Sequence, residues 1–481
     1  MKFNDMHQMN RKISVGVLWN LASMLLSRGS STIFTLILAR LLAPESFGLI
    51  AMMMIVLELA HHFVQSGLGQ ALIRSKEVSD VDLSTVFVTN LSISVLAYFL
   101  LYIGAPWLSE FYEQPELTNL LRVIGIVIFF NALKVVPIAI LSRRMNFRSQ
   151  MLVETFAVLV SGVIAISLAS NDFGVWSLVG QSITTACISA GLLLYVTSWK
   201  PKLSFCLASF QRHFAFGMNL LIIGTIRILV QNSYVMVIGR FFSAEVTGLY
   251  FLAKKVSQLI SQQLSGAVQK ATYPAMATLQ DDNTLLRKKY RQIIQVMLFI
   301  IAPIMLLLAA LSKPLFSLIL GSEWMEAVVY LQLLCMVAIL YPIHAMNINV
   351  LKVKGRSDLV LKIGLLKNTS SLILLFIALP YGVFWIVVSQ LVNSLISLIP
   401  NTYFTVRLIG YGLKEQMLDI FKPVVAAGAS SLIVFFVVET APLSDVYLLM
   451  SGVLLGGFTF LITSLVLRIE ALTLILTKVR G

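Results

Sequence analysis

The chain has 481 residues, of which 58% are hydrophobic and only 12% are charged. A soluble domain carries about 25% charged residues, so this chain has too few charges to solvate the surface of a soluble protein. Its three widely separated cysteines exclude a disulfide framework and a CxxC metal site. The net charge of +14 would suit a nucleic-acid partner, but the basic residues map to the ends of apolar segments. We therefore expect a membrane protein and no nucleic acid.

Apolar windows bounded by charged residues, Pro or Gly predict an all-α integral membrane protein with about fourteen membrane-spanning helices. Their length excludes an outer-membrane barrel, whose strands are about ten residues long. The first window follows a basic start and has no cleavage site of small residues, which predicts a retained helix and not a secretory signal. The expected ranges are 13–40, 46–73, 83–106, 117–141, 150–170, 173–198, 213–239, 246–273, 292–313, 327–351, 359–380, 382–406, 417–438 and 446–467.

The basic residues predict the orientation of these helices. With the N-terminus inside, the cytoplasmic tails and loops contain 26 of the 36 Lys and Arg residues, and the outer loops contain only Arg40, Arg240 and Lys313. Cytoplasmic loops of membrane proteins carry such an excess of Lys and Arg. Both termini are therefore expected in the cytoplasm.

Four segments recur in the same order along the chain, which predicts an internal repeat. The pairs are ARLLAPESFGL (39–49) with GRFFSAEVTGL (239–249), SGLGQ (66–70) with SGAVQ (265–269), RSQMLVE (148–154) with RSDLVLK (356–362), and FGVWSLVGQ (173–181) with YGVFWIVVSQ (381–390). Six helices separate equivalent points, so both copies have the same orientation. We expect an N-lobe at 1–199, an interfacial cytoplasmic linker at 200–212, a C-lobe at 213–411 and a final helix pair at 412–481.

Parallel repeats are typical of secondary transporters, whose substrate cavity lies near the bilayer midplane between the repeats. Seven basic residues fall within the predicted helices. Arg28 lies twelve residues before Arg40, and Arg227 lies thirteen residues before Arg240. These spacings place both arginines about 18–20 Å from that interface, at equivalent repeat positions. An arginine at the bilayer midplane that faces lipid has a free-energy cost of at least several kcal/mol, so each of the two must contact protein or water.

Two explanations of these arginines are open. Glu58 lies at the depth of Arg28 on the next helix, so the two residues could form a structural ion pair. The second repeat has Gln258 at the matching position, so Arg227 lacks that partner. An uncompensated charge inside the membrane favours an anionic ligand over a purely structural role.

Other polar residues in the membrane are weaker candidates. Lys254 and Lys255 lie about one turn outward from Gln258 and would support Arg227, while Lys134 is less clearly placed. Glu58 and His62 share a helix face, where proton coupling is an alternative to polar packing, and packing is favoured.

The chain shows little sign of an enzyme. Asp80 and Asp82 form a DxD pattern, as found in nucleotide-sugar transferases, but the pattern stands in a short loop without a soluble catalytic domain. There is no Walker A motif, HExxH motif or nucleophile elbow. We expect no catalytic residue, no metal and no cofactor.

Several stretches together resemble the polysaccharide transporter branch of the multidrug/oligosaccharidyl-lipid/polysaccharide (MOP) superfamily, the Wzx-type flippases, nearest the colanic-acid and exopolysaccharide exporters. They are LARLLAPESFGLIAM, SGLGQALIRSKE, FYEQPEL, PIAILSRRMNFR, FGVWSLV, VIGRFFSAEVTGLY, YPAMATLQDD and LILGSEW. The resemblance implies a MATE-like fold in the bacterial inner membrane. It implies alternating-access translocation of undecaprenyl-pyrophosphate-linked oligosaccharide for exopolysaccharide, capsule or O-antigen synthesis. A polysaccharide polymerase complex would be a further partner.

The implied substrate agrees with the charged residues, because a pyrophosphate requires cations. Arg227 would be its main anchor, with Lys254 and Lys255 in support and Arg28 opposite. Many members of the family carry an acidic residue shortly before IGR, where this chain has the residues 231–234, QNSY. Cation coupling through that position is therefore not expected.

Three alternatives stay open. A MATE-like drug or cation extruder of the same fold would place acidic residues in its cavity, which the count of seven basic residues to one deep acidic residue disfavours. A lipid II flippase has closely related chemistry but fits the stretches above less well. A membrane glycosyltransferase would require a catalytic acid in a large outer loop, and all of these loops are short.

Overall fold

The computed structural model describes residues 29–65 and 67–474, which form helices and contain no strand. The chain divides into two compact units, Met1–Gly248 and Leu249–Gly481. Among the described residues, eleven helices are long and apolar enough to cross a membrane. The prediction of an all-α, multi-pass membrane protein is confirmed. The count of fourteen spans and the lobe boundaries 1–199, 200–212, 213–411 and 412–481 stay predictions.

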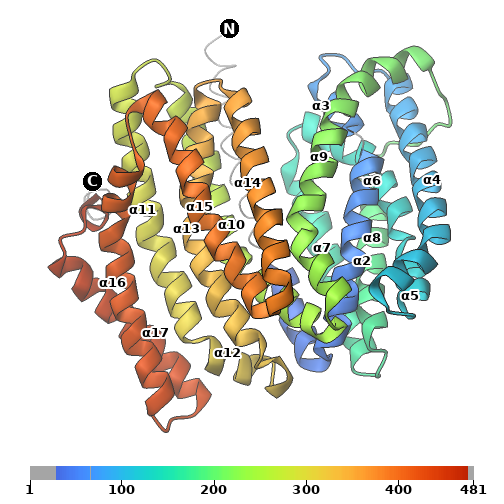
Figure 1. Cartoon of the computed structure of the whole chain (residues 1–481). Coiled ribbons are helices and arrows are strands. Elements are labelled where there is room, and N and C mark those ends of the chain that lie inside the picture. Colours follow the sequence, from blue (N-terminus) through green and yellow to red (C-terminus); the bar gives the residue numbers. More distant parts are fainter. Residues whose placement is uncertain (1–28, 66, 475–481) are drawn as a thin grey trace. The chain divides into compact units, whose positions relative to one another are not determined.

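The first unit consists of helices that run side by side (Figure 1), and it ends in the first turn of α10. Among them α9 packs against α2, α3 and α4, and α7 pairs with α8. Their bounds are Gly29–Leu41, α2 Pro44–Gln65, α3 Leu68–Arg74, α4 Asp80–Tyr112, α5 Leu117–Ile124, α6 Val127–Arg143, α7 Phe147–Ala169, α8 Val175–Thr197 and α9 Leu207–Phe241.

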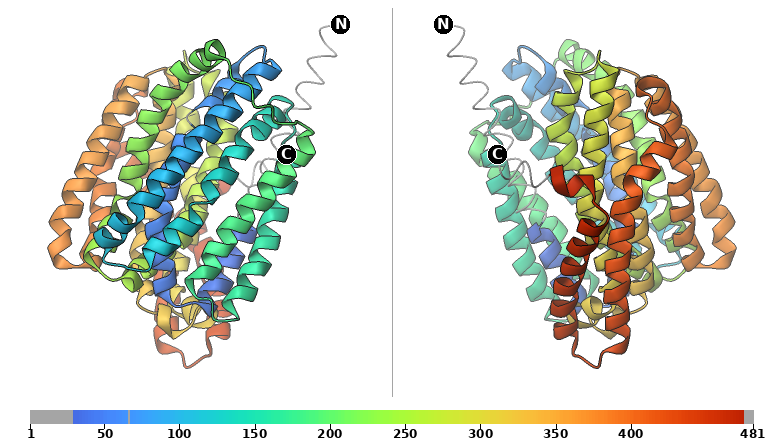
Figure 2. Two further views of the ribbon diagram at one scale, coloured as in Figure 1. Left: turned by 90° about the vertical axis from the view of Figure 1, so that its right-hand side faces the viewer. Right: turned by 90° about the vertical axis from the view of Figure 1, so that its left-hand side faces the viewer.

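The second unit contains most of α10 and the remaining helices. Its long helices pack in neighbouring pairs, α11 with α16, α13 with α15 and α16 with α17. The last pair forms the antiparallel hairpin at the lower edge in the right-hand view of Figure 2. The bounds are α10 Ala244–Ala277, α11 Asn283–Ala310, α12 Ser312–Ile319, η1 Ser322–Trp324, α13 Ala327–Val353, α14 Ser357–Ala378, η2 Leu379–Tyr381, α15 Val383–Ile409, α16 Leu413–Thr440 and α17 Asp445–Val466.

The DxD pattern has a structural role at the start of α4. The Ser79 hydroxyl accepts a hydrogen bond from the Asp82 backbone N–H (3.2 Å), and the Asp82 carboxylate accepts one from the Ser79 N–H (3.0 Å). This capping box satisfies backbone donors at the first turn. The Asp82 carboxylate also accepts a hydrogen bond from the Ser209 hydroxyl (2.5 Å), and Asp80 lies 3.7 Å from Lys202. Helix capping and contacts with the 200–212 segment therefore account for both carboxylates.

The predicted span 46–73 is wrong as a single helix. The structure ends α2 at Gln65 and begins α3 at Leu68, and Gly67 between them has the left-handed backbone φ of 69°. Only glycine adopts this conformation without strain. The chain therefore changes direction inside an apolar run, next to the cavity described below.

The repeated segments begin equivalent helices. The first pair opens α2 at Pro44 and α10 at Ala244. The last pair opens α8 and α15 directly after Gly174 and Gly382, whose φ values are 53° and 93°. The repeat seen in the sequence thus corresponds to shared local structure.

The basic residues that the sequence assigns to the cytoplasm gather at one end of each unit. In the first unit, Arg143 lies against the backbone of Lys76, and Lys202 lies beside Asp80. In the second unit, the Lys354 ammonium contacts Asn283 (2.6 Å) at the start of α11. This clustering agrees with the predicted orientation, which itself stays a prediction.

Candidate functional site

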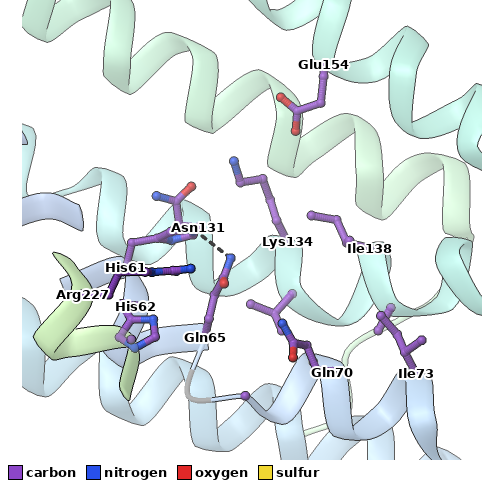
Figure 3. A pocket seen from close by; sticks show the side chains of 15 residues that line it. His61, His62, Gln65, Gln70, Ile73, Asn131, Lys134, Ile138, Glu154 and Arg227 are labelled. Carbon is purple, nitrogen blue, oxygen red and sulfur yellow. Dashed lines mark hydrogen bonds between the residues drawn. The ribbon is translucent and has the colours of Figure 1, made fainter. Parts of the chain in front are cut away.

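A cavity of about 600 Å³ opens within the first unit, between α2, α3, α6, α7 and α9 (Figure 3). The break at Gly67 exposes both α2 and α3 to it. The lining is mixed, with apolar side chains interrupted by imidazoles, amides and charged groups. Its polar members are His61, His62, Gln65, Gln70, Asn131, Lys134, Glu154 and Arg227.

Two cations predicted from the sequence line this cavity. Arg227 stands on α9, and Lys134 stands near the middle of α6, about 14 Å along the helix from Arg143. The Arg227 side chain lines the cavity, is exposed, and makes no hydrogen bond or ion pair with any other residue that the structure describes. Its guanidinium therefore keeps its donors available for a ligand.

A carboxylate that sequence reasoning missed faces Lys134. Figure 3 shows the Lys134 ammonium and the Glu154 carboxylate pointing toward one another across the cavity. Within residues 29–65 and 67–474, no carboxylate lies within 4.0 Å of this ammonium. Glu154 belongs to the repeated segment RSQMLVE, and its counterpart in RSDLVLK is Lys362. This change of charge between the two copies is the feature of the sequence that could have indicated Glu154 as a candidate.

Two neighbouring histidines of α2, His61 and His62, line the cavity. The His62 Nε2 lies 2.9 Å from the carbonyl oxygen of Leu221 on α9 and donates a hydrogen bond to it. A Cβ at Gly224 would overlap the same imidazole, so alanine there would force the His62 ring to move. The Gln65 amide donates to the His61 Nε2 (2.8 Å). His62 thus packs against backbone, and a coupling role for it stays a prediction.

Glu58 does not line the cavity. Its carboxylate accepts a hydrogen bond from the Asn232 amide (2.9 Å), and this bond connects α2 to α9. Arg28 lies outside the described residues, so the expected Arg28–Glu58 pair stays a prediction.

The two lysines of the predicted cluster lie on α10 in the second unit. The Lys254 ammonium is 5.9 Å from the centroid of the Tyr250 ring, and the Lys255 ammonium is 5.9 Å from that of Phe251. These distances suit cation–π contacts. Arg227 and Lys134 line one cavity of the first unit, whereas Lys254 and Lys255 belong to the second unit. The roles of these two lysines stay predictions.

Arg143 fastens the short α3 that borders the cavity. Its guanidinium donates to the carbonyl oxygens of Leu72 (2.7 Å), Ser75 and Lys76 (3.1 Å) at the end of α3. These carbonyls have no partner within the helix, so the arginine satisfies them and its charge suits the helix C-terminus.

We expect Arg143→Ala to destabilise α3, because it removes several hydrogen bonds from a charged donor. Each such bond contributes about 1.5–3 kcal/mol. Hydrogen exchange should accelerate across Leu68–Arg74. Arg144→Ala is the matched control, since the Arg144 side chain is exposed and makes no hydrogen bond to a described residue. Equal exchange in the two variants would contradict the capping role.

The described helices and this cavity define a multi-pass membrane protein with a cation-bearing polar cavity inside its helices. Ionisable groups within membrane-spanning helices mark substrate or ion pathways in membrane transporters. The chain belongs to the family described as polysaccharide biosynthesis protein, which matches residues 37–329.

Three curated proteins that are similar to this chain are also named for biosynthesis. The teichuronic acid biosynthesis protein TuaB of Bacillus subtilis (strain 168) is 28% identical over 297 residues, 61% of this chain and 61% of TuaB. The lipopolysaccharide biosynthesis protein WzxC of Escherichia coli (strain K12) is 24% identical, over 75% of this chain and 74% of WzxC. The succinoglycan biosynthesis transport protein ExoT of Rhizobium meliloti (strain 1021) is 26% identical, over 66% of this chain and 64% of ExoT. The predicted resemblance to Wzx-type exporters is confirmed.

Solved structures show the fold. The lipid II flippase MurJ in an inward closed conformation superposes with a TM-score of 0.74 at 16% identity, covering 94% of this chain and 99% of MurJ. An inward-facing multidrug resistance MATE transporter of the MOP superfamily gives 0.61 at 14% identity, covering 80% and 95%. The predicted MATE-like fold is therefore confirmed.

Proposed function

We propose that this chain is a flippase, not an enzyme, which moves undecaprenyl-pyrophosphate-linked oligosaccharide across the bacterial inner membrane by alternating access. The observation that carries the proposal is the cavity of the first unit, where Arg227 and Lys134 bring cations and donor groups into the interior of a membrane-spanning bundle. The relatives named for teichuronic acid, lipopolysaccharide and succinoglycan support a surface-polysaccharide precursor as the cargo.

The chemistry of such a cargo requires these groups. A pyrophosphate needs charge-assisted donors when it leaves water, and guanidinium groups bind phosphate oxygens in a bidentate manner. Each unpaired sugar hydroxyl would cost several kcal/mol in hydrocarbon, so amides such as Asn131, Gln65 and Gln70 are suitable lining groups. An inside-negative potential favours outward movement of the anion by about 2.3 kcal/mol per charge per 100 mV.

In this proposal Arg227 is the main pyrophosphate anchor and Lys134 the second cation of the same cavity. Arg28, Lys254 and Lys255 would support the anion at other stages of the cycle. Glu58 is held by Asn232, so it serves helix packing and not ion coupling. The termini would lie in the cytoplasm, and a polysaccharide polymerase complex would receive the product.

The alternatives are less well supported. A drug or cation extruder would present net negative charge to its ligand, whereas this cavity has two cations and one carboxylate. The likeness to MurJ concerns the fold, and the curated relatives are named for surface polysaccharides and not for lipid II. A glycosyltransferase would need a catalytic acid, and the carboxylates of the DxD pattern are engaged in capping and helix contacts.

The test is the leaflet distribution of undecaprenyl-linked oligosaccharide in a host strain that lacks this chain. Mass spectrometry combined with enzymatic labelling from the outer face should show accumulation in the inner leaflet, reversed by the wild-type chain. An absence of any lipid-linked intermediate in the deletion strain would instead place the chain in synthesis and contradict the flippase proposal.

A further inference from the structure

An apolar groove of about 480 Å³ lies in the second unit, and none of its lining residues belongs to the cavity of the first unit. It runs between the C-terminal half of α10 and the N-terminal half of α11, and Leu474 closes one side. Aliphatic side chains form most of its wall, including Val268, Met276, Val296 and Ile300.

The polar groups of the groove gather toward the start of α11. Lys289 and Gln292 stand one helical turn apart and both line it. The remaining polar lining residue, Thr272, donates its hydroxyl to the carbonyl oxygen of Val268 (2.8 Å) and is therefore satisfied. The groove thus has a cationic mouth and an apolar floor.

The dimensions match one leaflet of a bilayer. α11 is one of the helices long and apolar enough to cross a membrane, and Lys289 lies in its second turn. Ile300 follows eleven residues later, about 17 Å deeper along the helix. The hydrocarbon core of a leaflet is about 15 Å thick, so the groove has the length of one acyl chain.

The charges at the mouth are arranged to leave Lys289 available. The neighbouring arginines are engaged, since Arg287 contacts Glu415 (2.7 Å) and Arg291 contacts Asp419 (2.6 Å). The Lys289 side chain is exposed and makes no ion pair or hydrogen bond with the rest of the described chain. A basic residue at the end of an apolar groove between membrane helices is suited to a lipid headgroup.

We propose that this groove binds an anionic phospholipid of the surrounding leaflet, with the phosphate at Lys289 and Gln292 and one acyl chain along α10 and α11. The seven residues after Leu474 are a less suitable occupant, because Lys478 and Arg480 would bring further positive charge to Lys289. A phospholipid anion complements the lysine and its chain complements the aliphatic wall. The bound lipid would join α10 to α11 in the membrane and raise the stability of the second unit.

The experiment uses the full chain purified in nanodiscs that contain either phosphatidylglycerol or phosphatidylcholine. Native mass spectrometry should show retention of phosphatidylglycerol by the wild-type chain, with a higher melting temperature than in phosphatidylcholine. Lys289→Glu should weaken retention about tenfold, because it replaces an attraction with a repulsion at the headgroup. The matched control is Lys288→Glu, whose residue is exposed and does not line the groove.

A second variant tests the acyl chain independently of charge. Val296→Trp fills the groove and leaves Lys289 in place, so it should also reduce retention of phosphatidylglycerol while the chain stays monodisperse. Equal retention of both phospholipids, or equal losses for Lys288→Glu and Lys289→Glu, would overturn the proposal. Displacement of phosphatidylglycerol from the wild-type chain by undecaprenyl phosphate at equal concentration would also overturn it, and would assign the groove to the polyprenyl cargo.

Discussion

Replacing Arg227 with alanine should lower outward flux of the lipid-linked oligosaccharide about 30-fold, with the protein still folded and inserted. The estimate follows from the loss of charged hydrogen bonds to the pyrophosphate worth about 2 kcal/mol in total. Arg227→Lys should recover only part of the flux, because an ammonium keeps the charge and loses the bidentate geometry. The measurement is the rate of outer-leaflet labelling in cells with matched expression.

Arg122→Ala is the control, because it removes an arginine from a predicted membrane helix without changing the cavity. Its guanidinium lies 4.4 Å from the centroid of the Tyr102 ring and does not line the cavity, so flux should stay near the wild-type value. Because Arg227 and Lys134 line one cavity, the double alanine variant should lose less than the sum of the two single effects. Full flux in Arg227→Ala would discard the anchor while leaving the flippase function intact.

Most of the long helices were predictable because they are apolar runs of membrane length. The break at Gly67 was not. SGLGQ interrupts the first copy of the repeat at Gly67, whereas SGAVQ stands inside the continuous α10. A glycine within a helix costs only about 1 kcal/mol, so its presence alone does not distinguish a break from a continuous helix. The surrounding packing makes that choice, including the Arg143 contacts at the end of α3.

For the candidate site, depth along a helix indicated which charged residues lie far from both interfaces. It pointed to Arg227, whereas Lys134 was only a weaker candidate inside a predicted helix. Glu154 was missed because it lies only two turns into α7, where a carboxylate resembles an interfacial residue. Glu58 was expected opposite an arginine, and the structure gives it the amide of Asn232. The direction in which a side chain points depends on helix rotation, which depth does not report.

The second large effect concerns Gly48 and Gly248, which occupy the same position in the two copies of the first repeated segment. In the structure they meet at the contact of α2 with the first turn of α10. A Cβ at Gly48 would overlap the carbonyl oxygen of Ala244, and a Cβ at Gly248 would overlap that of Pro44. Each copy therefore accepts the backbone of the other in the same way, and small residues allow such close approach of membrane helices.

Gly48→Ala and Gly248→Ala should each reduce the unfolding free energy by about 3 kcal/mol, at the upper end of overpacking effects, because the obstacle is backbone and cannot rotate away. Denaturation in mixed micelles measures this, with Gly104→Ala as control, since nothing lies within 4 Å of a Cβ there. That control should be neutral or slightly stabilising, as alanine favours helix. The double variant should cost less than the sum, because helices separated by one methyl group already accommodate the second. Single variants as stable as the control would mean that the two repeats do not touch at these glycines.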